Sequence, residues 1–243
     1  MSRQPSRQPS RVRHPGVAVR RRQLLPAWVR RMDVAAARRI NARRVHPAVD
    51  RGYAGLSRAA DRGALWFSMA LLLLLFGRRR AAFRGAGSLI VASILANLVG
   101  KKVFGGDRPL LDDIPVGRRL KKQPESASFP SGHSASAAGF ATGVALESPR
   151  AGLAIAPVAA AVAYSRLHTG AHWFSDVVGG VALGAAVADV GRLLVPVPVR
   201  VPAADRAART RAERTRAART RAARTPAERT PAERTQGAQP VSP

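Results

Sequence analysis

The chain of 243 residues contains no cysteine, and its 14 acidic residues are far outnumbered by 41 lysines and arginines. Without cysteine, neither a disulfide framework nor a thiolate metal site can form. The scarce carboxylates form no spare cluster of the kind that binds magnesium, and Asp107, Asp112 and Asp113 are interpreted as loop acids. No apolar segment follows the first positive charges at the distance usual for a secretory signal peptide, so none is predicted.

The net charge of +27 is concentrated at the two ends of the chain. Residues 1–63 hold 16 arginines and three aspartates, and residues 192–243 hold 12 arginines and four acidic residues. Basic ends of this kind favour nucleic acid or anionic lipid as a partner. Because they flank apolar segments and no nucleic-acid-binding motif accompanies them, anionic membrane lipid is predicted, and no specific nucleic acid. For the tail, the alternative is that its alanine and arginine content reflects a compositional bias and that it binds no partner.

Five apolar segments lie between the basic ends and predict an all-α transmembrane helical bundle. They cover residues 64–76, 85–100, 133–147, 151–168 and about 173–197. The first is short for a span of about 20 residues. Several are rich in glycine, alanine and serine, a composition that suits close helix packing. A soluble bundle is the alternative, but the leucine run followed by an arginine triplet favours a multi-pass protein of the cell membrane.

The composition divides the chain into three parts. Residues 1–62 form a basic, partly disordered arm that could hold membrane-surface helices, residues 63–197 form the membrane domain, and residues 198–243 form a low-complexity tail. From Ala207 the tail repeats every five residues, which matches neither the helical nor the strand period, so no continuous apolar face can form. Pro226 and Pro231 interrupt any helix in the tail further. Both arms are expected to be disordered, the N-terminal one in part.

Three blocks of polar residues are set into the apolar domain between residues 101 and 176. They are Lys101 with Arg108-Pro109, Pro130-Ser131-Gly132-His133, and Ser165-Arg166 with His172 and Asp176. Together they supply three cations, two imidazoles and one carboxylate. These are the groups needed to hold a phosphate, to attack it, and to protonate the leaving oxygen.

Each block has its own chemical logic. Arg108 and Arg166 can donate bidentate hydrogen bonds to phosphate oxygens, and Lys101 adds a point charge. The small residues before His133 leave free N–H groups at a helix start, which is an anion site. His172 and Asp176 are four residues apart and would share a face on one helix, so the carboxylate could fix the imidazole tautomer. His168 is a rival nucleophile, but no carboxylate follows it at that spacing.

These blocks and their separations resemble the pattern of the type 2 phosphatidic acid phosphatase (PAP2) superfamily, over about residues 60 to 197. The resemblance implies that His172 attacks phosphorus to form a phosphohistidine, that Asp176 orients it, and that His133 is the general acid. It also implies no metal and no cofactor. The residues that would hold the phosphoryl group are Lys101, Arg108, Ser131, Gly132, Ser165 and Arg166.

The predicted function is hydrolysis of a lipid phosphomonoester or isoprenoid diphosphate. Phosphatidate, phosphatidylglycerol phosphate and polyprenyl-linked phosphates all present the same reacting group. One alternative is a non-catalytic membrane protein that binds lipid phosphates, although binding alone needs no His172–Asp176 pair. Another is a vanadium-dependent haloperoxidase, because PAP2 proteins resemble those enzymes, but those relatives are soluble.

The membrane orientation is predicted from the loops. The stretch 101–132 and the turn 165–172 must lie on one side of the membrane for the three blocks to meet. The short loop Arg78–Arg84 lies on the other side, and its four arginines place it in the cytoplasm. The active site is then extracytoplasmic, although the charge of the N-terminal arm argues for the reverse.

Overall fold

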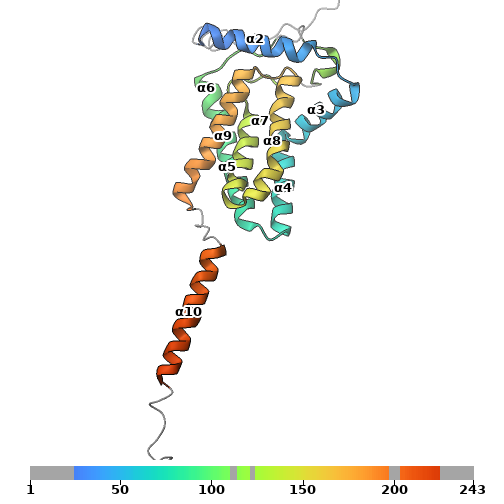
Figure 1. Ribbon diagram of the computed structural model, residues 1–243. Helices are drawn as coiled ribbons and strands as arrows, with labels where there is room; N and C mark the ends of the chain where they lie inside the picture. Colours follow the sequence, from blue (N-terminus) through green and yellow to red (C-terminus); the bar gives the residue numbers. More distant parts are fainter. Residues whose placement is uncertain (1–24, 110–113, 121–123, 197–202, 225–243) are drawn as a thin grey trace, which may run out of the picture. The chain divides into compact units, whose positions relative to one another are not determined.

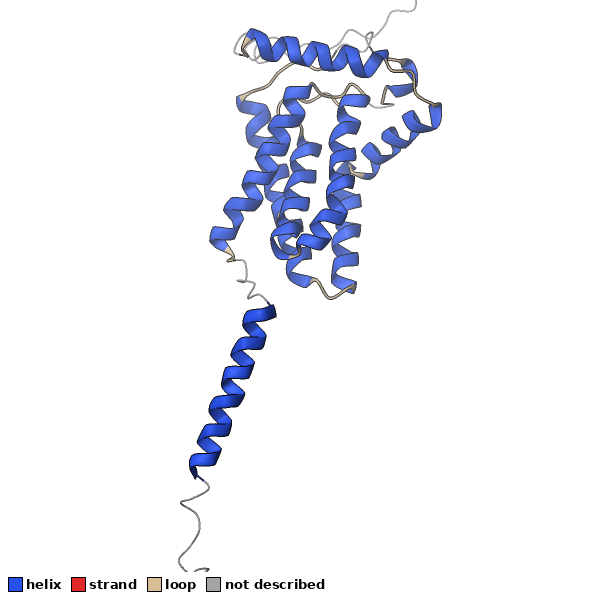
Figure 2. Cartoon of the chain, in the orientation of Figure 1, coloured by secondary structure: helices blue, strands red, loops and turns tan. Residues whose placement is uncertain are grey.

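The computed structural model describes residues 25–109, 114–120, 124–196 and 203–224, and these residues form helices without any strand (Figures 1 and 2). The chain forms two compact units, residues 1–197 and residues 198–243. The all-α fold class expected from the sequence is confirmed. Residues 1–24, the start of the arm that was predicted to be partly disordered, lie outside the described residues.

A bundle of helices makes up the first unit, with α7 at its centre (Figure 1). Helix α7 packs against α5, α8 and α9, and α4 packs against α5. Helix α5 continues into a π-helical turn, η2, and then into the short helix α6. The helices of the bundle are α4 (Ala64–Leu75), α5 (Arg79–Ile94), η2 (Leu95–Gly100), α6 (Lys101–Val103), α7 (Gly132–Glu147), α8 (Pro149–His168) and α9 (Phe174–Leu194).

Small residues let the backbones of α5, α7 and α9 approach closely, as their composition predicted. A Cβ atom added at Gly184 of α9 would lie 2.1 Å from the carbonyl oxygen of Ala135 on α7. A Cβ atom added at Gly139 of α7 would lie 3.0 Å from the carbonyl oxygen of Ser88 on α5. Larger side chains fill the space on the other side of α7, where the rings of Trp66 and Phe140 lie 5.4 Å apart. The helices therefore meet through their backbones, and their relative positions are tightly defined.

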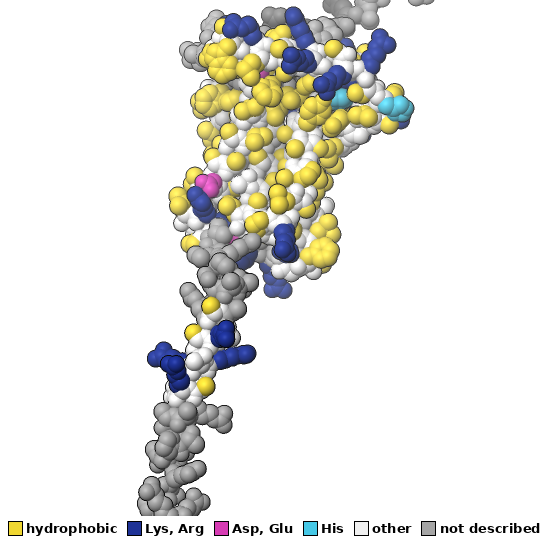
Figure 3. All heavy atoms as spheres, in the orientation of Figure 1, with side chains coloured by type: hydrophobic (Ala, Val, Ile, Leu, Met, Phe, Trp, Pro, Cys, Tyr) yellow, Lys and Arg dark blue, Asp and Glu magenta, His cyan; other side chains and the backbone are white. Residues whose placement is uncertain are grey.

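The outer surface of the bundle is suited to a membrane. Two helical stretches have the length and hydropathy to cross one: Arg79–Val103, with 25 residues, and Phe174–Leu194, with 21 residues. Helices α4 and α7 have 12 and 16 residues, shorter than the span of about 20 that a bilayer requires. Apolar side chains cover the middle of the bundle in Figure 3, and lysines and arginines gather toward its ends.

The N-terminal helices are fastened to the bundle at the end where α8 leads into α9. These are α2 (Ala27–Ala42), α3 (Pro47–Ala59) and the 3-10 turn η1 (Asp61–Gly63), and a second such turn, η4 (Val116–Arg118), contacts α3. On α2, the buried Asp33 accepts hydrogen bonds from the backbone N–H and the hydroxyl of Ser175 at 2.7 and 2.8 Å. On α3, Asp50 accepts from the Nε of Arg118 at 3.0 Å and pairs with the Nε2 of His168 at 2.7 Å.

The second unit contains helix α10 (Ala203–Arg224) in the region of the five-residue repeat. Alanine, arginine and glutamate are good helix formers, so local propensity supports the helix despite the lack of an apolar face. The side chains described on α10, those of residue 208 and residues 210–220, are all exposed. Pro226 and Pro231 lie beyond the described residues.

The close contact between α7 and α9 can be tested at Gly184. We expect Gly184→Val to lower the free energy of unfolding of the detergent-solubilised protein by about 1–3 kcal/mol, because the added carbons would force the helices apart. Gly191→Ala is the matched control, since it lies on the same helix and its Cβ would meet no atom within 4 Å. Thermal unfolding of both variants checks this, and equal midpoints would contradict the packing described.

Candidate active site

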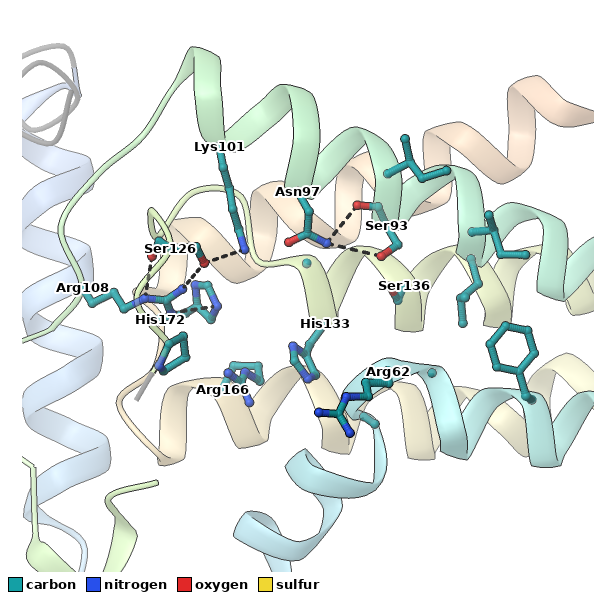
Figure 4. Close-up of a pocket in the computed structure, with 18 residues that line it drawn as sticks. Arg62, Ser93, Asn97, Lys101, Arg108, Ser126, His133, Ser136, Arg166 and His172 are labelled. Carbon is teal, nitrogen blue, oxygen red and sulfur yellow. Dashed lines mark hydrogen bonds between the residues drawn. The ribbon is translucent and has the colours of Figure 1, made fainter. Parts of the chain in front are cut away.

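A cavity of about 460 Å³ opens among α4, α5 and α7, at the end of the bundle where the loops gather (Figure 4). It is lined by six of the nine residues that the sequence singled out: Lys101, Arg108, Gly132, His133, Arg166 and His172. The other three, Ser131, Ser165 and Asp176, are fully buried and do not line it. Residues more than 70 positions apart in the chain therefore meet in one cavity.

His172 presents one ring nitrogen to the cavity side and the other to the protein interior. Its Nε2 lies 3.2 Å from Nη1 of Arg108, and its Nδ1 lies 3.5 Å from Oδ2 of Asp176. A guanidinium can only donate, so the lone pair of the imidazole must be on Nε2 and its proton on Nδ1. Burial lowers the pKa of His172 well below its ordinary value, although Asp176 acts in the opposite direction. The ring is thus neutral, and the electron pair on Nε2 accepts a hydrogen bond from Arg108 at the cavity.

Asp176 is held rigidly behind His172. It is the third residue of α9, and its Oδ2 accepts the backbone N–H of Trp173 at 2.9 Å, as in a capping box. The same oxygen accepts a hydrogen bond from the hydroxyl of Ser128. The expectation that His172 and Asp176 share a helical face needs correction: α9 begins at Phe174, so His172 lies in the turn before it. The turn nevertheless brings the imidazole to the carboxylate.

The three predicted cations converge on the cavity from three different elements. Nζ of Lys101 on α6 donates to the hydroxyl of Ser126 at 3.0 Å, and Nε of Arg108 donates to the carbonyl of the same residue at 3.1 Å. On α8, Arg166 is only 2% exposed and donates through Nη1 to the hydroxyl of Ser57. Its Nε has no hydrogen-bond partner among the described residues. A buried, unpartnered donor beside two other cations fits an anion in the cavity.

Ser131 and Ser165 were predicted to hold the phosphoryl group, but their hydroxyls form hydrogen bonds within the helices. The hydroxyl of Ser131 caps α7, accepting hydrogen bonds from the backbone N–H and the hydroxyl of Ser134 at 3.4 and 2.9 Å. The hydroxyl of Ser165 donates to the carbonyl of Val162 at 2.6 Å. Gly132 does line the cavity, and a Cβ there would lie 2.9 Å from the side-chain amide of Asn97. Ser131 and Ser165 therefore do not present their hydroxyls to a phosphate in this structure.

His133, the second residue of α7, is paired with a residue that sequence reasoning missed. Its Nε2 lies 2.8 Å from Oδ1 of Asp61 in η1. The hydrogen bond from His133 lowers the pKa of Asp61 below its ordinary value. By the same pairing, the Asp61 carboxylate stabilises a proton on the imidazole of His133. Burial and the cations of the cavity oppose that proton and lower the pKa of His133, and Asp61 offsets part of this effect. A histidine that can release its proton at the edge of the cavity is suited to act as a general acid.

Ser126, Ser128 and Asp61 carried no recognisable signal in the sequence. The serines lie in a long polar loop. Asp61 lies in the N-terminal arm, where many arginines surround the few acidic residues. The rival nucleophile, His168, pairs with Asp50 and does not line the cavity. Within the described residues, no group of three or more histidine, aspartate or glutamate side chains is arranged to hold a metal ion.

Comparisons with known proteins agree with this geometry. A family model described as the PAP2 superfamily matches residues 81–197. The chain is 33% identical over 122 residues to an undecaprenyl-diphosphatase of Sulfolobus acidocaldarius, covering 49% of this chain and 58% of the relative. It is 36% identical over 137 residues to a decaprenylphosphoryl-5-phosphoribose phosphatase of Mycobacterium tuberculosis, covering 55% of this chain and 73% of the relative.

Among solved structures, the chain is similar to LpxE of Aquifex aeolicus, with a TM-score of 0.55 and 23% sequence identity. The superposition covers 65% of this chain and 92% of that structure. At this identity the similarity concerns the fold. Together with the family match and the 36% identity over most of the mycobacterial relative, it shows that this chain belongs to the PAP2 superfamily.

Proposed function

We propose that the protein is a membrane phosphatase that hydrolyses the phosphomonoester or diphosphate of a lipid through a phosphohistidine. The observation that carries this proposal is the lone pair of His172 Nε2, which faces a cation-lined cavity that also has apolar lining. Phe67, Leu89, Ile90 and Ile94 supply that apolar lining. The relatives that match the chain bear the names of lipid and polyprenyl phosphatases, which supports the same class of substrate.

In the first step, Nε2 of His172 attacks phosphorus and the bond to the leaving oxygen breaks. The electron pair of that bond remains on the leaving oxygen, which takes a proton from His133. Arg108, Lys101 and Arg166 compensate the charge on the phosphoryl oxygens. Positive charge develops on the His172 ring as the bond to phosphorus forms, and Asp176 stabilises it through Nδ1–H.

In the second step, water attacks the phosphohistidine and gives its proton to His133. The bond between phosphorus and Nε2 breaks, which releases inorganic phosphate and restores neutral His172. Both steps use only groups of this chain that lie on or directly behind the cavity surface. Ser128 assists by fixing the carboxylate of Asp176 in place.

We further propose that the bundle crosses the membrane several times with its cavity at the extracytoplasmic side. The turn between α4 and α5 lies at the opposite end from the cavity, and Arg78, Arg80 and Arg84 are there. Arg80 and Arg84 both donate to Glu147, with Nε–oxygen distances of 3.1 and 2.8 Å. The basic residues near this turn still outnumber the acidic ones, which favours the cytoplasm for this end.

Phosphate release tests the reaction. Purified protein in detergent, with EDTA and no added metal, is expected to release phosphate from at least one of phosphatidate, phosphatidylglycerol phosphate, undecaprenyl diphosphate and a polyprenyl-phosphosugar phosphate. His172→Ala should reduce turnover by at least about a thousandfold, because it removes the nucleophile. His46→Asn is the control, since His46 lies at the start of α3 and does not line the cavity. Full activity in His172→Ala would refute the mechanism.

The pairing of Asp61 with His133 predicts a change in the pH profile. Catalysis requires the proton on His133, so the basic limb of the kcat/KM profile marks its loss. Asp61→Asn removes the carboxylate that stabilises this proton, and the basic limb should move to lower pH by about half a unit to one unit. His133→Ala should slow poor leaving groups most.

Asp189→Asn is the matched control for Asp61, because both carboxylates are 55% exposed and only Asp61 contacts the site. A basic limb at the same pH in Asp61→Asn and in the unsubstituted protein would exclude this role for Asp61.

The absence of native cysteine permits a direct test of orientation. Val116, at the cavity end, is 76% exposed, and Phe76, at the opposite end, is 78% exposed. Each is replaced by cysteine in turn. We expect a membrane-impermeant maleimide to label Val116→Cys in intact cells and Phe76→Cys only after permeabilisation. The opposite labelling pattern would place the site in the cytoplasm.

A further inference from the structure

The turn η1 directs a fourth cation, Arg62, into the cavity. Arg62 lines the cavity beside Gly63 and Ala60, across from the helix that carries Lys101 (Figure 4). Its φ of 55° makes it the one non-glycine residue with positive φ among the described residues. An L-residue with a branched or long side chain is disfavoured there, and such strain is typical of functional sites. Neighbouring contacts hold the turn in place, since Asp61 bonds His133 and Gly63 lies close to the Phe67 ring.

The guanidinium of Arg62 differs from those of the other two arginines in the cavity. Arg108 is held by Ser126 and Ala171, and Arg166 is held by Ser57. Arg62 is exposed, and the described residues provide it with no hydrogen bond and no ion pair, although its charge interacts with the neighbouring Asp61. Asp61, the adjacent carboxylate, has Oδ1 paired with His133. Arg62 is therefore a cavity cation whose donors are available to a ligand.

Arg62 lies between the phosphoryl end and the apolar part of the cavity. Figure 4 shows Arg108 and His172 at one end, the apolar side chains at the other, and Arg62 between them near His133, with Ser93 and Asn97 on the opposite side. Asn97 donates to the carbonyl and hydroxyl of Ser93 at 2.9 and 3.3 Å and lies over Gly132. A lipid whose terminal phosphoryl group reaches His172 and whose chain lies among the apolar residues would carry its intervening group past Arg62.

We propose that Arg62 binds a second phosphate group, the one that stays on the lipid when the terminal phosphoryl group is transferred. This inference rests on the proposed phosphatase function and narrows its substrate to lipid diphosphates. A guanidinium matches phosphate through paired N–H donors. When His172 attacks the terminal phosphorus, the bond to the bridging oxygen breaks and its electron pair stays on the lipid monophosphate. That new charge forms next to Arg62, while His133 supplies the proton.

Farnesyl diphosphate and farnesyl monophosphate make a matched substrate pair, because they differ only in the second phosphate. The full-length protein in detergent is assayed for kcat/KM with each, by release of inorganic phosphate. In Arg62→Gln, the ratio of kcat/KM for the diphosphate to that for the monophosphate should fall by about tenfold or more, as expected for a lost charge-assisted hydrogen bond. Arg62→Lys should lose less.

Two further variants separate binding from folding and from net charge. Arg62→Gly removes the guanidinium but suits the positive φ, so its thermal midpoint should not fall while its selectivity ratio falls as in Arg62→Gln. Arg58→Gln is the control: Arg58 is exposed on α3, does not line the cavity, and carries the same charge. Inhibition by pyrophosphate should also weaken more than inhibition by phosphate in the Arg62 variants.

The outcomes are distinct for the two proposals. Phosphate release by the unsubstituted protein that His172→Ala loses supports the phosphatase function whatever Arg62 does. An unchanged selectivity ratio in Arg62→Gln and Arg62→Gly would overturn the role of Arg62, as would a ratio that falls equally in Arg58→Gln. No release from either farnesyl substrate or from the lipid panel would refute both proposals.

Discussion

The close backbone contact between α7 and α9 is the constraint on which the rest of the site depends. At Gly180 of α9, a Cβ atom would lie 2.4 Å from the carbonyl of Ser131, which immediately precedes α7. The N–H of Ser131 in turn donates to the carbonyl of Asp176 at 3.0 Å. The starts of the two helices are thereby joined, and the side chains at those starts, His133 and Asp176, take fixed positions relative to each other. Without glycine at this crossing, the two histidines could not face one cavity.

Lys101, Arg108 and Arg166, the three cations nearest His172, repel one another, and this repulsion favours an anion between them. Burial lowers the pKa of Arg108 to about 10, and the guanidinium still remains charged. Asp176 offsets part of the positive charge from behind His172, and the hydroxyl and carbonyl of Ser126 hold Lys101 and Arg108. The cations are therefore oriented before any ligand arrives, so the proposed binding of a phosphoryl group would need little reorganisation. The low dielectric of a helical bundle strengthens the attraction.

The N-terminal segment contributes to this arrangement through its few acidic residues. Asp33, Asp50 and Asp61 are the three carboxylates within the first 62 residues, among many arginines. Each contacts a residue at the cavity end of the bundle: Asp33 contacts Ser175, Asp50 contacts Arg118 and His168, and Asp61 contacts His133. In a segment with a large positive charge, the scarce carboxylates make the specific contacts. The arginines among residues 25–62 are exposed.

The sequence by itself determined the helical architecture and indicated which polar side chains gather at the cavity. Runs of apolar and small residues specify helices locally, and Lys101, Arg108, His133, Arg166 and His172 were recognisable from their spacing, which follows the loops and helix starts of the bundle. Only the tertiary structure decided which hydroxyls face the cavity. The hydroxyls of Ser131 and Ser165 form hydrogen bonds within their own helices, whereas Ser126 lines the cavity and Ser128 donates to Asp176. It also decided that Asp61 reaches His133 and that Arg62 enters the cavity. Those contacts depend on how α3 and α4 meet the bundle, and sequence spacing carries no information on contacts across so long a separation.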